Sequence, residues 1–312
     1  MDIWGDTKIE FLAKRRYTFI ISAILALIGL VAIISVPAGK ANMGTDFSGG
    51  ISLQLRFDRP VEIDKVRKIL GDGGYKEANL QQFAEPTKLL VKLKGAKGDL
   101  GAITRDIGRV FAEGMADNPF RIDSTTEIGP TVGKKLQKDA LWAVGISLLA
   151  ILGYIAWRFE FRFGVAAVAA TFHDVVVVFG ILYLLDTEIT LLIITALLTL
   201  AGYSLTDTVV VFDRIRENLR KRTTEGFIPL VDRSINEVLR RTIVTTFTTL
   251  LVLVALFALG GEVIHDFSLT LLLGILVGTY SSIFIASPVL LLWKSKDREE
   301  PAQARRGAPA GS

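Results

Sequence analysis

The sequence of 312 residues has no cysteine and only two histidines, His173 and His265. Without cysteine there can be no disulfide, thiolate metal ligand or thiol nucleophile, and two histidines are too few for a multi-histidine metal site. Lys and Arg are also absent from six long apolar stretches, although 22% of the chain is charged. A mean hydropathy of +0.44 with ordinary charge content requires that the charges be segregated. These absences exclude a soluble single-domain enzyme and indicate a membrane protein.

The six apolar stretches are predicted to be transmembrane helices, because a bilayer core about 30 Å thick needs roughly 20 apolar residues per helix. They cover residues 17–36, 140–157, 163–184, 189–211, 242–259 and 267–293. The first follows Lys14-Arg15-Arg16, as a signal peptide would. Its apolar run is longer than a signal's, and no small-residue cleavage site follows, so we expect it to be retained.

Basic residues predict the orientation of these helices. They occur in the N-terminal segment 1–16, the turn 158–162, the region 212–241 and the tail 294–312, whereas the loops 185–188 and 260–266 have none. Short loops rich in Lys and Arg stay in the cytoplasm. Both termini are therefore expected in the cytoplasm, with residues 37–139 on the other side. The tail, which ends in Gly-Ala-Pro-Ala-Gly-Ser, is expected to be disordered.

Residues 37–139 are predicted to form a small α+β domain between the first two transmembrane helices, followed by a five-helix region at 140–293. Strands are expected over 51–57, 78–83, 88–93 and 120–128, with helices over 61–70 and after a capping Asp99. This βαββαβ order is that of a ferredoxin-like fold, which by itself names no function. Its strands lack aromatic-rich RNA-binding motifs, and no nucleic-acid partner is expected.

Asp174 and Asp207 are the only charged residues within the apolar stretches. A carboxylate in a transmembrane helix is costly and commonly faces a polar interior that conducts protons or ions. From the ~1.5 Å rise per helical residue, Asp174 is about 16 Å deep and Asp207 about 6 Å from the cytoplasmic edge. A structural polar contact is the alternative for Asp174 and its neighbour His173, and a static ion pair or a surface-reaching side chain is the alternative for Asp207.

Arg241 opens the fifth stretch on the side where Asp207 lies, so the two side chains could pair. Burial disfavours a charged carboxylate and a nearby Arg favours it. A helix movement that makes or breaks this contact would switch the charge of Asp207 and could couple proton flow to a conformational change. One charge supplies about 2.3 kcal/mol per 100 mV, so repeated cycles would be needed. Alternatively, Arg241 and Arg240 only set topology.

Other patterns are less informative. Gly274, Gly278, Ser282 and Ala286 form a small-residue stripe that permits close helix contact, either within the chain or with another subunit. The segment 129–135 has the wrong spacing for a phosphate-binding loop. An intramembrane aspartyl protease is disfavoured because the two aspartates differ by about 10 Å in expected depth.

Several motifs, taken in order, resemble the SecD/SecF family of bacterial protein-export subunits, and specifically its SecF type. Asn42-Met-Gly-Thr-Asp-Phe-Ser-Gly-Gly50 is similar to the signature after the first helix, and Ile128-Gly-Pro-Thr-Val-Gly133 to the element before the second. Further similar motifs are Phe172-His-Asp-Val175, Gly202-Tyr-Ser-Leu-Thr-Asp-Thr-Val-Val-Val-Phe-Asp-Arg-Ile-Arg-Glu-Asn218 and Leu239-Arg-Arg-Thr-Ile243. The positions that carry structural motifs are Gly44, Asp46, Phe47, Gly49, Gly50, Gly129, Pro130 and Gly133.

The resemblance implies a member of the resistance-nodulation-division superfamily in the bacterial inner membrane, driven by proton flow rather than ATP. It also implies a SecD partner, the SecYEG channel, in some members YajC, and a translocating unfolded polypeptide, with no cofactor. By motif, Asp207 and Arg241 match residues associated with proton movement. Asp174 and His173 are further proton-relay candidates, and Asp46 is expected to be structural.

Our hypothesis is therefore a motor subunit without a covalent reaction, which converts protonation of Asp207 into movement of the exported domain. The alternatives are a proton-coupled exporter of small molecules or lipids in the same superfamily, and a passive scaffold of the export channel.

Overall fold

The protein is described by a computed structural model covering residues 8–83, 85–96, 98–158, 160–221 and 225–294. Within these residues, six helical segments are long and apolar enough to cross a membrane. A short 3₁₀ turn, Leu12–Lys14, leads into the first of them. The helices are α1 (Arg15–Ser35), α5 (Pro130–Arg158), α6 (Phe161–Leu184), α7 (Leu191–Arg220), α8 (Phe227–Leu259) and α9 (Glu262–Ser281), which continues through a π-helical turn (Ser282–Ala286) into α10 (Ser287–Lys294).

Three of these helices differ in extent from the apolar stretches. α5 begins at Pro130, α7 continues to Arg220 and α8 begins at Phe227, so most of the predicted loop 212–241 is helical. Hydropathy detects only the apolar part of a helix, and charged residues with good helix propensity extend it beyond the membrane. At the start of α5, Pro130 occupies the first helical position, where its missing N–H costs nothing.

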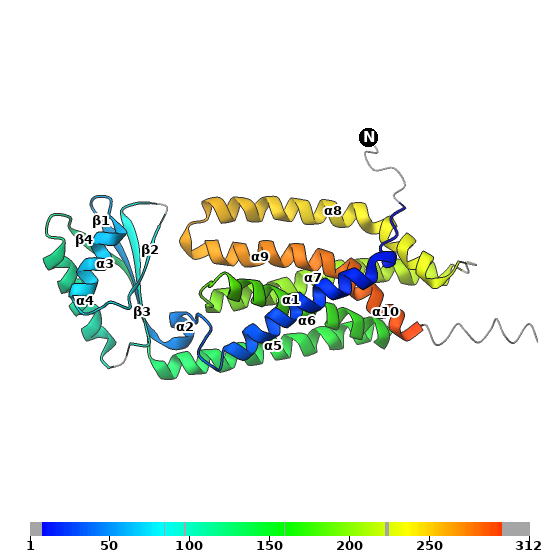
Figure 1. Cartoon of the computed structure of the whole chain (residues 1–312), viewed down its shortest axis with the longest axis horizontal. Helices are drawn as coiled ribbons and strands as arrows, with labels where there is room; N and C mark the ends of the chain where they lie inside the picture. Colours follow the sequence, from blue (N-terminus) through cyan, green and yellow to red (C-terminus); the bar gives the residue numbers. More distant parts are fainter. Residues whose placement is uncertain (1–7, 84, 97, 159, 222–224, 295–312) are drawn as a thin grey trace, which may run out of the picture.

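The six helices lie side by side, with a sheet beyond one end of the bundle (Figure 1). α6 and the α9–α10 segment are largely buried, whereas α5 and α8 expose most of their apolar residues. Helices that are apolar all round are buried or face lipid. The bundle is therefore organised around α6, α7 and α9, and the exposed faces of α1, α5 and α8 suit lipid or another protein.

A four-stranded sheet is formed by the residues between α1 and α5. Its elements lie where the sequence predicts them, and all neighbouring strands are antiparallel in the order β2-β3-β1-β4. The predicted N-cap is also found, since Asp99 Oδ1 accepts a hydrogen bond from the Ala102 N–H at 3.1 Å. The elements are α2 (Thr45–Ser48), β1 (Gly50–Phe57), α3 (Ile63–Asp72), β2 (Asn79–Gln82), β3 (Lys88–Lys94), α4 (Leu100–Gly114) and β4 (Phe120–Ile128).

One face of this sheet is covered by α3 and α4. Alternate residues of β1 are buried against Val66 and Leu70 of α3 and Ile107 and Phe111 of α4. The alternation predicted for β4 does not give a buried face, and Ile122 is 43% exposed. β4 is an edge strand and pairs on one side only, so its side chains have fewer neighbours.

The predicted disordered tail lies outside the described residues, apart from Lys294, which ends α10.

Candidate functional site

Asp174 lies in the middle of α6 with a fully buried side chain. Its Oδ2 accepts hydrogen bonds from Ser204 Oγ of α7 at 2.5 Å and from Ser281 Oγ of α9 at 2.7 Å. Two hydroxyl groups from two other helices thus converge on one carboxylate oxygen. Buried polar groups need such partners because an unsatisfied one costs several kcal/mol in an apolar medium.

The other carboxylate oxygen of Asp174 faces its neighbour His173. His173 Nδ1 lies 3.1 Å from Asp174 Oδ1, while His173 Nε2 is buried and has no hydrogen-bond partner among the described residues. Thr171 Oγ1, one turn earlier on α6, is likewise buried without a described partner. These two atoms leave hydrogen-bonding capacity beside Asp174 that a proton or a water molecule could use.

A second contact between small polar side chains joins α7 to the end of α9, one turn along α7 from Ser204 and one residue after Ser281. Ser282 Oγ lies 2.9 Å from Thr208 Oγ1, which is next to Asp207 on α7. We call Ser204, Thr208, Ser281 and Ser282 the polar seam. Ser282 is the first residue of the π-helical turn. Such turns are rare in proteins overall, and those that occur are often found at functional sites.

Asp207 lies on the α8 side of α7 and is half-buried. It interacts with Thr242 of α8, although its Oδ2 and Thr242 Oγ1, both buried, do not reach full hydrogen-bonding geometry with any described residue. The two intramembrane aspartates do not hydrogen-bond to each other, since Asp174 has its own partners in Ser204 and Ser281. A shared-proton carboxylate pair, which an aspartyl protease needs, is not formed.

Arg241 lies at the predicted cytoplasmic end of the apolar part of α8 and is exposed. Its charge acts on Asp207, but no hydrogen bond or ion pair joins these two described side chains. The direct pair considered from the sequence is therefore absent from this conformation.

The small-residue stripe on α9 packs within the chain. A Cβ at Gly274 would lie 2.6 Å from Leu200 Cδ2, and one at Gly278 would lie 3.1 Å from Ser204 Cβ. Both neighbours belong to α7. Of the two alternatives raised by the sequence, this arrangement corresponds to intramolecular packing, and it brings Ser281 within reach of Asp174.

The glycine-rich segment 42–50 joins the sheet to the helices. Asp46 Oδ2 accepts a hydrogen bond from the Leu191 N–H at 2.9 Å, which caps the start of α7. Gly133 of α5 lies against the backbone of α2, where a Cβ would be 2.8 Å from the Phe47 carbonyl oxygen. Gly49 and Gly50 have φ of +73° and +138°, which other residues rarely adopt. Pro130 begins α5 directly after Gly129. These contacts show that the segment packs against the starts of α5 and α7 and so links the sheet to the helices.

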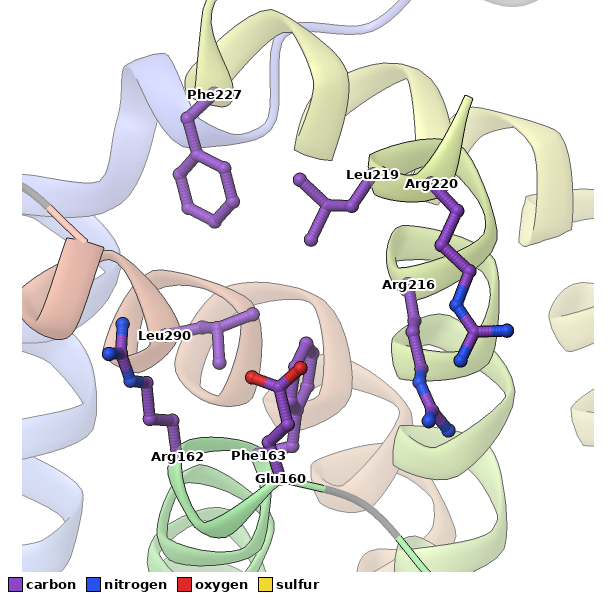
Figure 2. Close-up of a pocket in the computed structure, with 8 residues that line it drawn as sticks. All are labelled: Glu160, Arg162, Phe163, Arg216, Leu219, Arg220, Phe227 and Leu290. Atoms are coloured by element: carbon purple, nitrogen blue, oxygen red, sulfur yellow. The ribbon is translucent and has the colours of Figure 1, made fainter. Parts of the chain in front are cut away.

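A hollow of about 260 Å³ lies at the end of the bundle away from the sheet, lined by residues of α6, α7, α8 and α10 together with Glu160 just before α6. Figure 2 shows Glu160 and Leu290 directed toward its middle, with Arg216 and Arg220 along one side. Its mixed charge favours no single class of ligand. Asp174 and Asp207 do not line it. Among the described residues, no three His, Asp or Glu side chains gather as metal ligands would.

The sequence identified the charged members of this region but not the hydrogen bonds of Ser204, Thr208, Ser281 and Ser282, although Ser282 was part of the small-residue stripe. Single serines and threonines are common in transmembrane helices, where they also bond to their own backbone. Only the partner across the helix interface distinguishes Ser281 from such residues.

Comparison with known proteins places these features in a family. The family described as "Protein export membrane protein SecD/SecF, C-terminal" matches residues 111–296. A protein translocase subunit SecF of Thermodesulfovibrio yellowstonii is 52% identical over 294 residues, covering 94% of this chain and 97% of that protein. One from Calditerrivibrio nitroreducens is 39% identical, covering 94% and 96%.

A solved structure has the same fold. The crystal structure of SecDF from Thermus thermophilus, a translocon-associated membrane protein, is similar with a TM-score of 0.79 and 38% identity over 94% of this chain. This chain spans 40% of the length of that SecDF chain. A second SecDF structure, in a "super-membrane-facing form", has a TM-score of 0.70 and 37% identity, covering 98% of this chain and 41% of that one.

Proposed function

Because this chain belongs to the SecD/SecF family of protein-export membrane proteins, we propose that it is an auxiliary subunit of the Sec translocase that uses the proton motive force to drive or complete protein export. The chain is a multi-pass membrane protein of protein transport. The observation that carries the proton-driven role is the polar seam, in which Ser204 and Ser281 donate to the buried Asp174 and Ser282 pairs with Thr208, the neighbour of Asp207 in the chain.

The polar seam could carry out proton movement in the following way. A proton arriving at Asp207 would neutralise the carboxylate and remove its attraction to Arg241. α7 and α8 could then repack around Thr242, the residue of α8 that faces Asp207. Ser204 and Asp207 are three residues apart on α7, so a shift of this helix also changes the hydrogen bonds of Asp174. No covalent step is involved, and we propose no enzymatic reaction and no cofactor.

We further propose that residues 37–139 form a ferredoxin-like domain on the periplasmic side of the bacterial inner membrane, with both termini in the cytoplasm. The element order β1-α3-β2-β3-α4-β4 and the strand order β2-β3-β1-β4 support the fold. The distribution of basic residues supports the orientation.

SecD is the proposed direct partner, together with the SecYEG channel, an unfolded client polypeptide and, in some systems, YajC. A relative named protein translocase subunit SecDF matches this chain over 40% of its own length, which leaves room for a second half. The exposed apolar faces of α1, α5 and α8 could meet such a half within the membrane. No observation favours the alternative roles as a small-molecule exporter or a passive scaffold.

The test is Asp207→Asn, measured in membrane vesicles that contain SecD and SecYEG. We expect normal assembly and loss of the part of export that depends on the proton gradient, because Asn cannot change charge. Asp213→Asn is the matched control, since Asp213 is also on α7 but its side chain is 46% exposed and lies 3.8 Å from Arg158. Full proton-dependent export by Asp207→Asn would show that the proposed motor is wrong. Efflux of a drug or lipid from vesicles without a secretory client would favour the exporter.

A further inference from the structure

The sheet is clamped to the loop between α6 and α7 by one acidic side chain. Glu188, in this loop, is 9% exposed. Its Oε2 accepts a hydrogen bond from Lys92 Nζ at 2.6 Å, and its Oε1 lies 3.3 Å from Lys94 Nζ. Lys92 and Lys94 are two positions apart on β3 and so project from the face of the sheet opposite to the one covered by α3 and α4.

Main-chain hydrogen bonds tie the same loop to the segment before β1. The Ile189 N–H donates to the Asn42 carbonyl oxygen and the Gly44 N–H donates to the Ile189 carbonyl oxygen, each at 2.8 Å. Lys94 Nζ also donates to Asn42 Oδ1 at 2.5 Å. Asp186, in the loop, has φ of +53°, a conformation that a non-glycine residue holds only when its surroundings require it.

This loop is the direct covalent connection between the two helices that carry the intramembrane carboxylates. Asp174 is on α6 and Asp207 is on α7, and only residues 185–190 separate these helices. The sheet has a second attachment to the bundle, because β4 leads directly into α5 and α2 packs against Gly133. Besides the chain connection from α1 through α2 to β1, the sheet is thus attached to the bundle at α5 and at the α6–α7 loop.

Because the sheet is attached both at α5 and at the α6–α7 loop, a shift of these helices relative to each other would move one attachment with respect to the other. If α6 and α7 move relative to α5, the Glu188 contact moves while the α5 contact stays, and the sheet tilts about α5. To transmit the helix movement, the ion pairs of Glu188 with Lys92 and Lys94 must stay formed during it. A half-exposed ion pair would be too weak for this. A buried carboxylate between two ammonium groups is suited to this use, because separating it from them leaves an uncompensated charge.

We infer that Glu188 is the positioning residue through which movements of α6 and α7 are transmitted to the sheet, with Lys92 and Lys94 as its receiving partners. This inference rests on the proposed proton-driven function and names the contact by which it reaches the exported domain. In this scheme Glu188 acts through its ion pairs with Lys92 and Lys94.

The absence of cysteine in the chain permits a direct test with two introduced labels. Lys76→Cys labels an exposed position of the sheet domain, and Leu259→Cys labels the end of α8, where the side chain is 85% exposed. Fluorescence energy transfer between the labels is measured in the complex with SecD in proteoliposomes, with and without an imposed proton gradient. We expect the gradient to shift the distance distribution in the otherwise unchanged chain and to leave it unshifted in Glu188→Gln.

The matched control is Asp123→Asn, which breaks an ion pair of similar length within the sheet, 2.7 Å to Arg56 Nε, without touching the loop. This variant should keep the gradient-dependent shift. If Glu188→Gln does not assemble with SecD, Lys92→Gln decides the question, since it removes the shorter of the two ion pairs from the other side.

The outcomes separate the inference from the proposed function. A shift in Glu188→Gln or Lys92→Gln as large as in the unchanged chain overturns the role of Glu188 and leaves the proton-driven function standing. Absence of any shift in the unchanged chain overturns the proposed function and the inference with it. Loss of the shift in Asp123→Asn as well would show that any break in the sheet abolishes it, and would also overturn the specific role of Glu188.

Discussion

Ser281 on α9 donates a hydrogen bond to Asp174 on α6 at 2.7 Å, one residue before α9 changes into a π-helical turn. The π-helical turn therefore begins directly after the residue that holds Asp174, the most deeply buried carboxyl group of the bundle. Since Ser282 also contacts Thr208, the two consecutive serines connect α9 to both helices that carry intramembrane aspartates.

Ser281→Ala should destabilise the protein and weaken proton-dependent export, because it removes one of two hydroxyl donors from the buried carboxylate. Removing one hydrogen-bond partner of a buried polar group costs about 1–3 kcal/mol. Thermal unfolding in detergent and export in vesicles measure the two effects. Ser268→Ala is the control, since Ser268 is buried on the same helix but bonds only to the carbonyl oxygens of Ile264 and His265. Equal effects of both substitutions would contradict a special role for Ser281.

Arg241→Lys should retain more export activity than Arg241→Gln. In this structure Arg241 influences Asp207 through its charge, without a hydrogen bond between them, and Lys keeps that charge. The ratio of proton-dependent export rates in vesicles tests this, with membrane levels of both variants measured in parallel. If Lys and Gln are equally defective, the planar guanidinium group itself is needed, and a direct Asp207–Arg241 pair in another conformation becomes the better account.

Gly278→Ala should lower stability by about 1–3 kcal/mol, the usual range for overpacking a close contact. The new Cβ would lie 3.1 Å from Ser204 Cβ and would push Ser204 away from Asp174. Gly202→Ala, on α7, is the control because nothing lies within 4 Å of its added Cβ. It should be neutral or stabilising by up to about 1 kcal/mol. Melting temperatures of the two variants test this prediction. An unchanged melting temperature in Gly278→Ala would mean that α7 and α9 are loosely packed at this contact.

Tyr75→Phe should change how the stability of the sheet domain depends on pH. The Tyr75 hydroxyl donates to Asp106 Oδ2 at 2.7 Å, and this hydrogen bond holds the pKa of Asp106 below its usual value. A lowered carboxyl pKa stabilises the fold above the unfolded pKa of about 3.9, and this contribution is lost as the pH falls through the folded pKa. The stability difference between the two proteins should therefore be larger at pH 7 than near pH 3.

The hydrogen-bonded pair of Tyr75 and Asp106 also predicts how Tyr75 ionises at alkaline pH. Burial, assisted by Asp106, raises the pKa of Tyr75 to about 12. The raised pKa adds stability that is present below about pH 10 and lost as the pH rises through about 12. Ultraviolet titration should show a late-ionising tyrosine, and the amplitude of that late step should fall in Tyr75→Phe. Tyr154→Phe, an exposed position on α5, serves as control, and an unchanged late step in Tyr75→Phe would contradict the assignment.

Much of the architecture could be predicted from local patterns. Long apolar runs mark transmembrane helices because the bilayer sets their length, and alternation in residues 51–57 marks a strand because successive side chains face opposite sides. The sequence-based predictions were wrong where the local sequence pattern does not match the environment of the residues in the fold. β4 alternates but lies at an edge, so Ile122 stays exposed, and the charged residues of 212–241 are largely helical.

The sequence by itself determined that the chain spans a membrane, that Asp174 and Asp207 are the charges within it, and which family its motifs belong to. These properties depend on the composition of single segments and on the order of residues within short motifs, so they can be read without knowledge of tertiary contacts. Only the tertiary structure decided that Asp174 is held by Ser204 and Ser281, and that Glu188 meets two lysines of the sheet. Such partners lie 30 to 107 residues apart in the chain, and close packing of helices and sheet brings them together.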